Sequence, residues 1–236
     1  MSGHSKWATT KRQKGAADVK RGAIFTKLGN AITVAAKLGG GDPESNFRLR
    51  LAIDLAKSAN IPKDNIERAI KRGTGELGGG IIESITYEGF GPFGTAFIIE
   101  ALTDNRNRSS SSIKHTLTKY GGSLGVSGSV GWLFEQKGVL RIKKINDELE
   151  LELIDVGLQD FAIEEDGVTI YTAPTDLKKV KDFLEKKEIA VEYAEIEQVA
   201  KEKKQLSPEE KEKLEKLYAE LEDNEDVNNY YTNAEI

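Results

Sequence analysis

The residues in this sequence that most clearly suggest a chemistry are the cations near its N-terminal end. Lysine and arginine contact phosphates and release condensed counterions, and an exposed indole stacks on an unpaired base. The first 37 residues contain Trp7, a single acid (Asp18) and eight cations: Lys6, Lys11, Arg12, Lys14, Lys20, Arg21, Lys27 and Lys37. We predict a nucleic-acid-binding surface here. The plainer alternative is a solvated helix face, with Trp7 as a core side chain.

A second group of cations would extend this surface. Arg48 and Arg50 lie in the next expected helix, and Lys71 and Arg72 end the one after it. Arg50 could instead pair with Asp54, one helical turn further on. The sequence leaves both interpretations of Arg50 open.

Residues 104–108 lie between an expected strand and an expected helix. Their Arg106 and Arg108 suit the clamping of a phosphate or of an RNA backbone. Asp104 and Asn105 equally suit a turn or a helix cap, because their side chains bond to nearby backbone N–H groups. The serines at 109–112 are expected in the first helical turn, where hydroxyls satisfy free amides.

No pattern in the sequence matches a catalytic centre or a cofactor site. Cysteine is absent, which excludes disulfides and thiolate zinc sites, and His4 and His115 stand in no metal-ligand spacing. Residues 89–94 spell GxGxxG, but strand-like residues flank them on both sides, whereas a dinucleotide-binding loop opens a helix. We expect no enzymatic activity, no cofactor, no metal and no small-molecule substrate.

Charge is distributed unevenly along the chain. Residues 1–80 hold 15 Lys and Arg against 7 Asp and Glu, a net of +8, while the remainder holds 19 against 32, a net of −13. A basic segment of this kind is typical of contact with polyanions, and the acidic remainder would orient binding by repelling them. No apolar run approaches the roughly 20 residues of a membrane helix. We therefore expect a cytoplasmic protein whose partner is nucleic acid and not a membrane.

Helical periodicity organises the first 80 residues. Apolar positions spaced three and four apart predict helices over residues 16–38, over residues 44–59, and from Pro62 to Gly73. Glycines 39–41 with Pro43 should end the first helix, and residues 78–80 are typical of a linker. We predict a basic helical nucleic-acid-binding domain over residues 1–80.

The rest of the chain predicts a mixed α+β fold in two further domains. Residues 137–204 show the order β-α-β-β-α-β of a ferredoxin-like domain. Residues 81–136 predict strands, including one over residues 129–134, but too few elements to close a sheet. We therefore expect residues 205–236 to return to them and complete a discontinuous α+β domain. A capping box at Ser207 should start a helix there, while the acidic tail from residue 222 should fray.

Several segments of the sequence resemble the YebC/PmpR family. They are MSGHSKW at 1–7, IFTKL at 24–28, LGGGDP at 38–43, RLRLAI at 48–53, PKDNIERAI at 62–70, YEG at 87–89, LTDNRNR at 102–108, KYGG at 119–122 and GSV at 128–130. The resemblance is specific over roughly the first 140 residues and looser beyond them. Residues 109–112 and 125–128 depart from the family's more acidic pattern.

The resemblance implies three domains around a cleft, one helical and two α+β, the middle one completed by the C-terminus. Family members are described as DNA-binding transcriptional regulators. Others resemble translation factors that act at the ribosome, including on proline-rich stretches, and a mitochondrial relative activates translation. The basic positions of the first domain match the nucleic-acid surface proposed for the family.

Three functional hypotheses follow. The first is a DNA-binding transcriptional regulator acting through the basic N-terminal domain. The second is a ribosome-associated translation factor that binds rRNA or tRNA with the same surface and aids synthesis of proline-rich stretches. Phosphate contacts cannot separate them, although no clear base-reading helix-turn-helix is evident and Trp7 among cations suits unpaired bases. The third is a non-catalytic protein-interaction scaffold.

Overall fold

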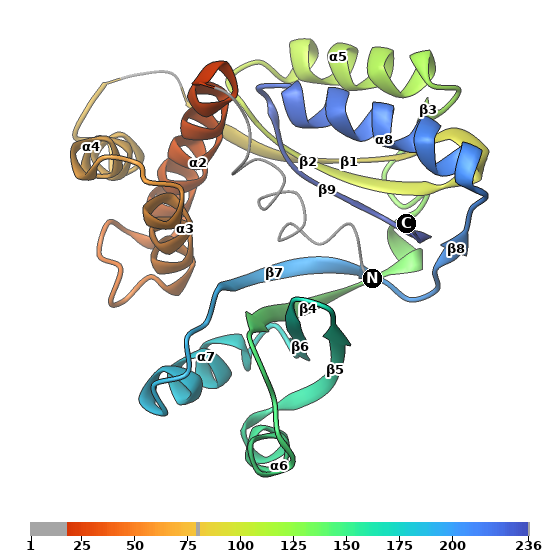
Figure 1. Cartoon of the computed structure of the whole chain (residues 1–236). Helices are drawn as coiled ribbons and strands as arrows, with labels where there is room; N and C mark the ends of the chain where they lie inside the picture. The colour runs from red at the N-terminus through yellow and green to blue at the C-terminus, as the bar shows by residue number, and fades with distance from the viewer. Residues whose placement is uncertain (1–17, 79–80, 236) are drawn as a thin grey trace. The chain divides into compact units, whose positions relative to one another are not determined.

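The computed structural model describes the backbone of residues 18–78 and 81–235, and side chains from residue 22 onward. Its contacts divide the chain into two compact units (Figure 1). Phe134–Val199 form the small unit, and the described residues up to Leu133 together with those from Ala200 form the large unit. The expected α+β class is confirmed, since each unit combines helices with a sheet that contains antiparallel strand pairs. Division of the large unit into a helical and a discontinuous domain stays a prediction.

Three helices open the large unit: α2 (Asp18–Gly39), α3 (Phe47–Ser58) and α4 (Lys63–Gly73). Their apolar residues recur at helical spacing, so each helix turns one face toward the others. This shared core consists mainly of Ile32, Ala35, Ala36, Leu49, Ala52, Ile53, Ala56, Ile61, Ile66 and Ala69. This packing fixes the positions of the exposed cations on the outer faces of the helices, such as Arg48, Lys71 and Arg72.

Asn46 joins the end of α2 to the start of α3. Its Oδ1 accepts a hydrogen bond from the Leu49 N–H at 3.1 Å, and its Nδ2 donates to the carbonyls of Ala35 and Gly40 at 2.9 and 2.8 Å. This N-cap explains why α3 begins at Phe47, three residues later than the sequence predicts. Gly40 has φ +88°, a conformation that favours glycine, so the glycine run ends α2 as expected.

The large unit continues with a four-stranded sheet in the order β3-β1-β2-β9. The strands are β1 (Glu83–Phe90), β2 (Ala96–Thr103), β3 (Ser123–Leu124) and β9 (Val227–Thr232). Helices α5 (Arg106–Lys119) and α8 (Pro208–Asp223) lie together on one face of this sheet (Figure 1). The core between them contains Phe97, Ile99, Ala101, Ile113, Leu117, Leu214, Leu217, Tyr218, Leu221, Val227 and Tyr230.

The C-terminal tail, which the sequence predicts to fray, is an ordered part of this sheet. β9 pairs antiparallel with β2 from Phe97–Thr232 to Ala101–Val227. Tyr230 is buried and stacks on Tyr218 with ring centroids 5.3 Å apart. The prediction was wrong because the tail's buried residues, Asp226 and Asn229 as well as Tyr230, find their partners only in distant segments of the chain.

Residues 129–134, which the sequence predicts as a strand, do not form one. The structure has a 3₁₀ helix η2 (Gly131–Leu133) there, and β4 begins only at Phe134. The Glu88 carboxylate accepts the backbone N–H groups of Gly128, Val130 and Gly131 at 2.8, 2.8 and 2.7 Å. Because these amides are bonded to a side chain, they are not available to a strand ladder.

Three short elements complete the large unit. The 3₁₀ helix η1 (Pro92–Gly94) connects β1 to β2, and β8 (Lys204–Gln205) pairs in parallel with β10 (Ala234–Glu235). The capping box predicted at the start of α8 is present: the Glu210 N–H donates to Ser207 Oγ at 3.3 Å, and the Ser207 N–H donates to Glu210 Oε2 at 2.9 Å. α8 therefore starts where local sequence chemistry places it.

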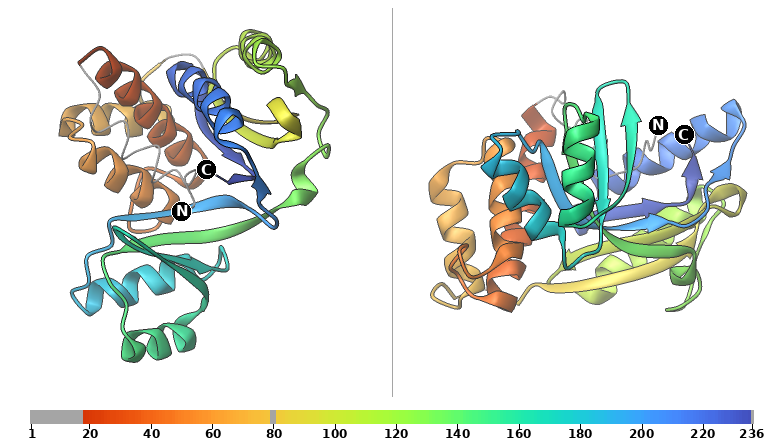
Figure 2. Two further views of the ribbon diagram at one scale, coloured as in Figure 1. Left: turned by 45° about the vertical axis from the view of Figure 1, so that its right-hand side comes forward. Right: turned by 90° about the horizontal axis from the view of Figure 1, so that it is seen from below.

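The small unit has the ferredoxin-like arrangement expected from the sequence. Its elements run β4 (Phe134–Ile142), α6 (Asp147–Val156), β5 (Leu158–Glu164), β6 (Gly167–Thr172), α7 (Leu177–Lys186) and β7 (Tyr193–Ala200). The strands are ordered β5-β6-β4-β7, and α6 and α7 lie on the same side of the sheet (Figure 2). The fully buried side chains include Leu140, Ile142, Leu153, Ile170, Val180 and Leu184.

Candidate nucleic-acid interface

Much of the predicted basic surface belongs to the start of the chain. The predicted contacts Lys6, Trp7, Lys11, Arg12 and Lys14 lie outside the described residues. Lys20 and Arg21 belong to α2, and their side chains lie outside the description as well. The role of these seven residues as nucleic-acid contacts stays a prediction.

Three of the predicted cations in the helical part are exposed. Arg48 lies in the first turn of α3, and Lys71 and Arg72 lie in the last turn of α4. Cations at a helix C-terminus interact favourably with its dipole, a structural role that is compatible with contact to a ligand. Arg50 differs from them because it is half-buried, with its guanidinium 5.2 Å from the centre of the Phe47 ring.

Lys27 is directed into the protein. Its Nζ donates to the carbonyl of Glu222 in the last turn of α8 at 2.5 Å. Burial lowers the pKa of Lys27 to about 8, against the opposing attraction of the Glu222, Asp223 and Glu225 carboxylates. Lys27 thus binds α2 to the C-terminal end of α8, a structural role that the basic pattern of the sequence does not reveal.

The connection between α3 and α4 has the length of a helix-turn-helix. Only residues 59–62 separate the helices, and Asn60 in this turn has φ +60°. On α4, Asn65, Arg68 and Arg72 are exposed, and their spacing of three and four places them on one face. The sequence showed no clear motif here, because short helices joined by such a turn have weak local signatures.

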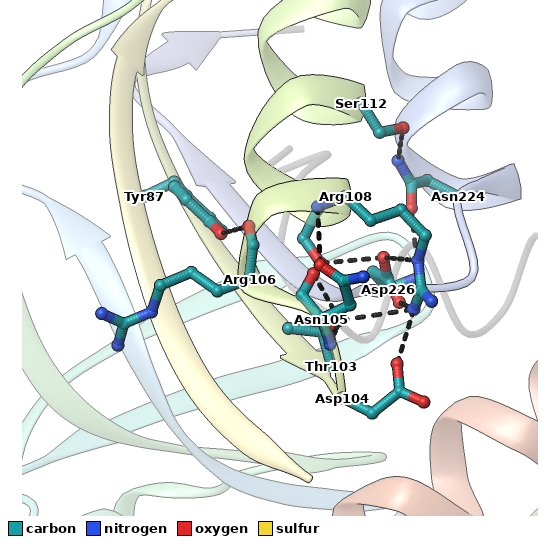
Figure 3. Close-up of polar contacts among 10 residues, drawn as sticks. Tyr87, Thr103, Asp104, Asn105, Arg106, Arg108, Ser112, Asn224 and Asp226 are labelled. Atoms are coloured by element: carbon teal, nitrogen blue, oxygen red, sulfur yellow. Dashed lines mark hydrogen bonds and ion pairs between the residues drawn. The ribbon is translucent and has the colours of Figure 1, made fainter.

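Arg108 is bound into a polar network at the end of β2 (Figure 3). Its Nε and Nη2 donate to the two carboxylate oxygens of Asp226 at 3.2 and 2.7 Å, and Nη2 also donates to Asp104 at 3.0 Å. Ser109 Oγ donates to the same Asp226 carboxylate at 2.8 Å. Of the two roles left open by the sequence, these contacts support the structural one for Arg108.

Burial of Asp226 opposes its ionisation, but the hydrogen bonds from Arg108 and Ser109 prevail and lower the pKa of its carboxyl below the ordinary value. In turn, hydrogen bonding and attraction to Asp226 raise the pKa of Arg108 above its ordinary value. The pair therefore remains ionised and joins β9 to the N-terminal turn of α5. Sequence reasoning missed Asp226, since its partners lie more than a hundred positions away.

The cap of α5 is Asn105, whose Oδ1 accepts the Arg108 N–H at 3.1 Å. The serines at 109–112 were expected in the first turn of this helix, but α5 begins at Arg106, so most of them lie beyond that turn. Ser112 Oγ instead accepts a hydrogen bond from Asn224 at 2.9 Å (Figure 3). The cap role left open for Asn105 is confirmed, whereas the serines were placed one turn too early because serine and asparagine both favour helix starts.

Arg106 is more exposed than Arg108 and makes fewer contacts within the protein, with 70% of its side chain exposed against 55% for Arg108. Its side chain is exposed and its Nη2 lies 3.7 Å from the Glu83 carboxylate, while its carbonyl accepts a hydrogen bond from the Tyr87 hydroxyl at 3.3 Å. Figure 3 shows its guanidinium directed away from the network around Asp226. Arg106 therefore fits a contact to phosphate better than Arg108 does.

The contribution of Asp226 to stability can be tested by replacing it with Asn. We expect a loss of about 1–3 kcal/mol at neutral pH, because the replacement removes charge-assisted hydrogen bonds from a largely buried carboxylate. The lowered pKa sets the pH dependence. The stabilisation is complete above the carboxyl's pKa in the unfolded chain and disappears as pH falls through its lower pKa in the folded protein. Urea unfolding of both proteins at neutral and acid pH measures this difference.

Asp104→Asn is a matched control, because Asp104 pairs with the same guanidinium but has a half-exposed side chain. We expect only a small loss of stability from it, as is usual for exposed pairs. Equal effects of the two replacements at neutral pH would contradict the role assigned to Asp226.

Two further features concern the described part of the chain. None of its helices is long and apolar enough to cross a membrane. Within the same residues, no group of three or more His, Cys, Asp or Glu side chains is placed to hold a metal ion.

The fold and the site define a multidomain α+β protein with a basic helical N-terminal part and a ferredoxin-like unit. The model of the TACO1/YebC protein N-terminal domain matches residues 5–76, and that of the TACO1/YebC second and third domain matches residues 82–234. The chain belongs to the TACO1/YebC family.

Similar proteins extend over essentially the whole chain. A probable transcriptional regulatory protein of Thermoanaerobacter pseudethanolicus is 51% identical over 240 residues, covering 100% of this chain and 98% of that protein. One from Caldanaerobacter subterraneus is 50% identical, with 100% and 99% covered. A crystal structure of a conserved hypothetical protein from Aquifex aeolicus has a TM-score of 0.84 at 45% identity and covers 93% of this chain and 92% of its own.

Proposed function

We propose that this protein is a non-catalytic, cytoplasmic regulator of gene expression that binds nucleic acid through its basic helical N-terminal part. The carrying observation is the distribution of charge. Residues 1–80 have a net charge of +8, whereas the small unit, residues 134–199, holds 9 cations against 17 acids. Such a chain meets a polyanion with one part only.

The described helices support this proposal. Arg48, Lys71 and Arg72 are exposed on α3 and α4, and positively charged side chains on helix surfaces are suited to phosphate contacts. The predicted contacts outside the described residues, Lys11 and Arg12 among them, would add to the same basic part. Lys27 and Arg108 are omitted from the proposed contact surface because the Lys27 ammonium is directed into the protein and the carboxylates of Asp104 and Asp226 already hold the Arg108 guanidinium.

Transcriptional regulation through DNA is the specific form that we propose first. The similar proteins bear the name probable transcriptional regulatory protein. The α3–turn–α4 pair has the connection length of a helix-turn-helix, and Asn65 and Arg68 lie exposed on its second helix. Asparagine and arginine are the side chains that most often read adenine and guanine in the major groove.

A ribosome-associated translation factor that binds rRNA or tRNA is the second candidate. It is favoured by the two tryptophans, Trp7 among the N-terminal cations and Trp132, which is exposed. Aromatic side chains beside cations suit unpaired bases, which RNA offers in its loops. A protein-interaction scaffold that uses the acidic small unit is the third candidate.

Ultraviolet crosslinking in living cells, with sequencing of both the RNA and the DNA recovered, tests these candidates. Discrete promoter DNA would support transcriptional regulation, and enrichment of rRNA or tRNA would support the translation factor. Affinity for the recovered nucleic acid should fall with salt at a log–log slope near −0.9 for each phosphate contacted on duplex DNA. Recovery of neither nucleic acid would contradict the proposal and favour the scaffold.

A further inference from the structure

Trp132 is a large aromatic residue whose side chain is exposed to solvent. Its relative exposure is 68%, although indoles are usually well buried. It belongs to η2, and its Nε1 donates to the carbonyl of Ser129 at 3.3 Å, which orients the ring. The Lys201 ammonium donates to the Trp132 carbonyl at 2.9 Å, and the Lys201 N–H donates to the Leu133 carbonyl at 2.9 Å. An exposed indole is thus attached to a fixed backbone, beside a cation.

Glu88 provides the rigid support for this backbone. Its carboxylate accepts the three N–H groups of Gly128, Val130 and Gly131, and its carbonyl accepts the N–H of Gly125 at 2.8 Å. Burial of Glu88 opposes its ionisation, but the three N–H groups prevail and lower the pKa of its carboxyl below the ordinary value. The loop is therefore held in place by a charged group. Because its backbone is already ordered, little backbone conformational entropy is lost when Trp132 binds a ligand.

The loop that contains Trp132 has no charged side chain of its own, and the Glu88 carboxylate that holds its backbone is satisfied by three N–H groups. Within this uncharged segment, residues 121–133, Val126 is 79% exposed. The adjoining segment contains Lys201 and Lys204. The Lys204 ammonium lies beside Gly94, 3.4 Å from the point where a Cβ atom of that residue would be. Across η1, the Lys213 ammonium lies 5.5 Å from the centre of the Phe93 ring. Among the described residues, Lys201, Lys204 and Lys213 form no ion pair with a carboxylate.

We propose that Trp132 is a stacking platform for an unpaired base, and that Lys201 and Lys204 contact the phosphates of the same strand. This inference rests on the proposed function and adds unpaired bases to the nucleic-acid features that the protein recognises. A single strand offers both chemistries, a flat π-face and a phosphate, at every nucleotide. Bases inside a duplex are already stacked on one another. An acidic peptide would satisfy the lysines but supplies no regular partner for the exposed indole.

Fluorescence tests the proposal directly, because the chain has only two tryptophans. In Trp7→Phe protein, all indole emission comes from Trp132. A short oligouridylate should quench this emission, whereas a blunt duplex RNA of similar length should leave it unchanged. A second probe, an oligothymidylate, distinguishes RNA from DNA as the ligand. Quenching by both strands would assign the platform to unpaired bases in general. Quenching by oligouridylate alone would assign it to RNA.

Affinities provide the second measurement. Trp132→Ala should weaken binding of the oligouridylate by roughly 5- to 150-fold, the loss expected for one stacked base, and leave duplex binding unchanged. Trp132→Phe should retain most of the affinity, because a ring remains. Ile163→Ala is the matched control, since Ile163 is 73% exposed and apolar but belongs to the small unit. Circular dichroism verifies that each variant is folded.

Two results would overturn the inference while leaving the proposed function intact. One is oligouridylate binding to Trp7→Phe protein without quenching of Trp132. The other is an unchanged affinity in Trp132→Ala together with loss of a protein that co-purifies with the wild type, which would make Trp132 a protein-docking residue. If the wild-type protein binds no oligonucleotide of any kind, both proposals fail.

Discussion

Replacing Lys11, Arg12 and Lys14 together by Glu is expected to abolish nucleic-acid binding and to leave the protein folded. The change converts three positive charges into three negative ones in a region where Asp18 is the only acid within the first 37 residues. Three phosphate contacts are lost and repulsion replaces them, so we expect the affinity to fall roughly a thousandfold or more at physiological salt. Fluorescence anisotropy with labelled duplex and single-stranded probes measures the loss.

A charge-matched control separates a binding surface from a general effect of net charge. Lys178, Lys179 and Lys186 are exposed on α7 of the acidic small unit. Their replacement by Glu changes the net charge by the same amount and should reduce affinity far less. Similar losses in both variants would show that net charge alone controls binding. Undiminished binding in the N-terminal variant would place the surface elsewhere.

Tyr230→Ala is expected to cause the largest loss of stability of any replacement considered. Tyr230 is 6% exposed, lies stacked against Tyr218, and has its ring centre 6.4 Å from that of Phe97. Truncation removes the buried ring and leaves a cavity, which typically costs about 3–5 kcal/mol for a large aromatic residue. Urea unfolding followed by circular dichroism measures the difference.

Tyr230→Phe is the control for this replacement. It keeps the ring and removes the hydroxyl, which donates a hydrogen bond to the Glu222 carboxylate at 2.9 Å. Its expected cost is about 1 kcal/mol, the usual net value of one hydrogen bond. If Tyr230→Ala were as stable as the wild type, β9 would not be the integral strand described above.

Local features of the sequence were sufficient to predict the positions of most of the helices. α6, Asp147–Val156, is the first helix of the predicted β-α-β-β-α-β order, and α8 starts at the capping box of Ser207. The ferredoxin-like order also followed from pattern alone, because alternation, turn residues and helix caps all act within a few positions. The α+β class and the asymmetry of charge could be predicted from the composition and pattern of successive segments.

Long-range contacts decided the roles of individual side chains. Lys27 belongs to the basic run in sequence, yet its ammonium binds a carbonyl of α8. Arg108 and Asp226 form their pair across 118 positions, and no local pattern marks it. The exposure of Trp132 depends on Glu88, because its carboxylate binds three N–H groups of the loop around Trp132 and keeps them from pairing in a strand.

The acidic tail shows the physical basis of this division most clearly. Its composition predicts a solvated, fraying end, and an isolated segment with so few apolar residues could not bury enough surface to offset its loss of conformational entropy. β2 changes that balance, because it offers a preformed edge of N–H and C=O groups above an apolar core that includes Tyr218. Periodicity and caps act locally and are visible in the sequence, whereas a strand that depends on a distant edge is stabilised only when the chain has folded.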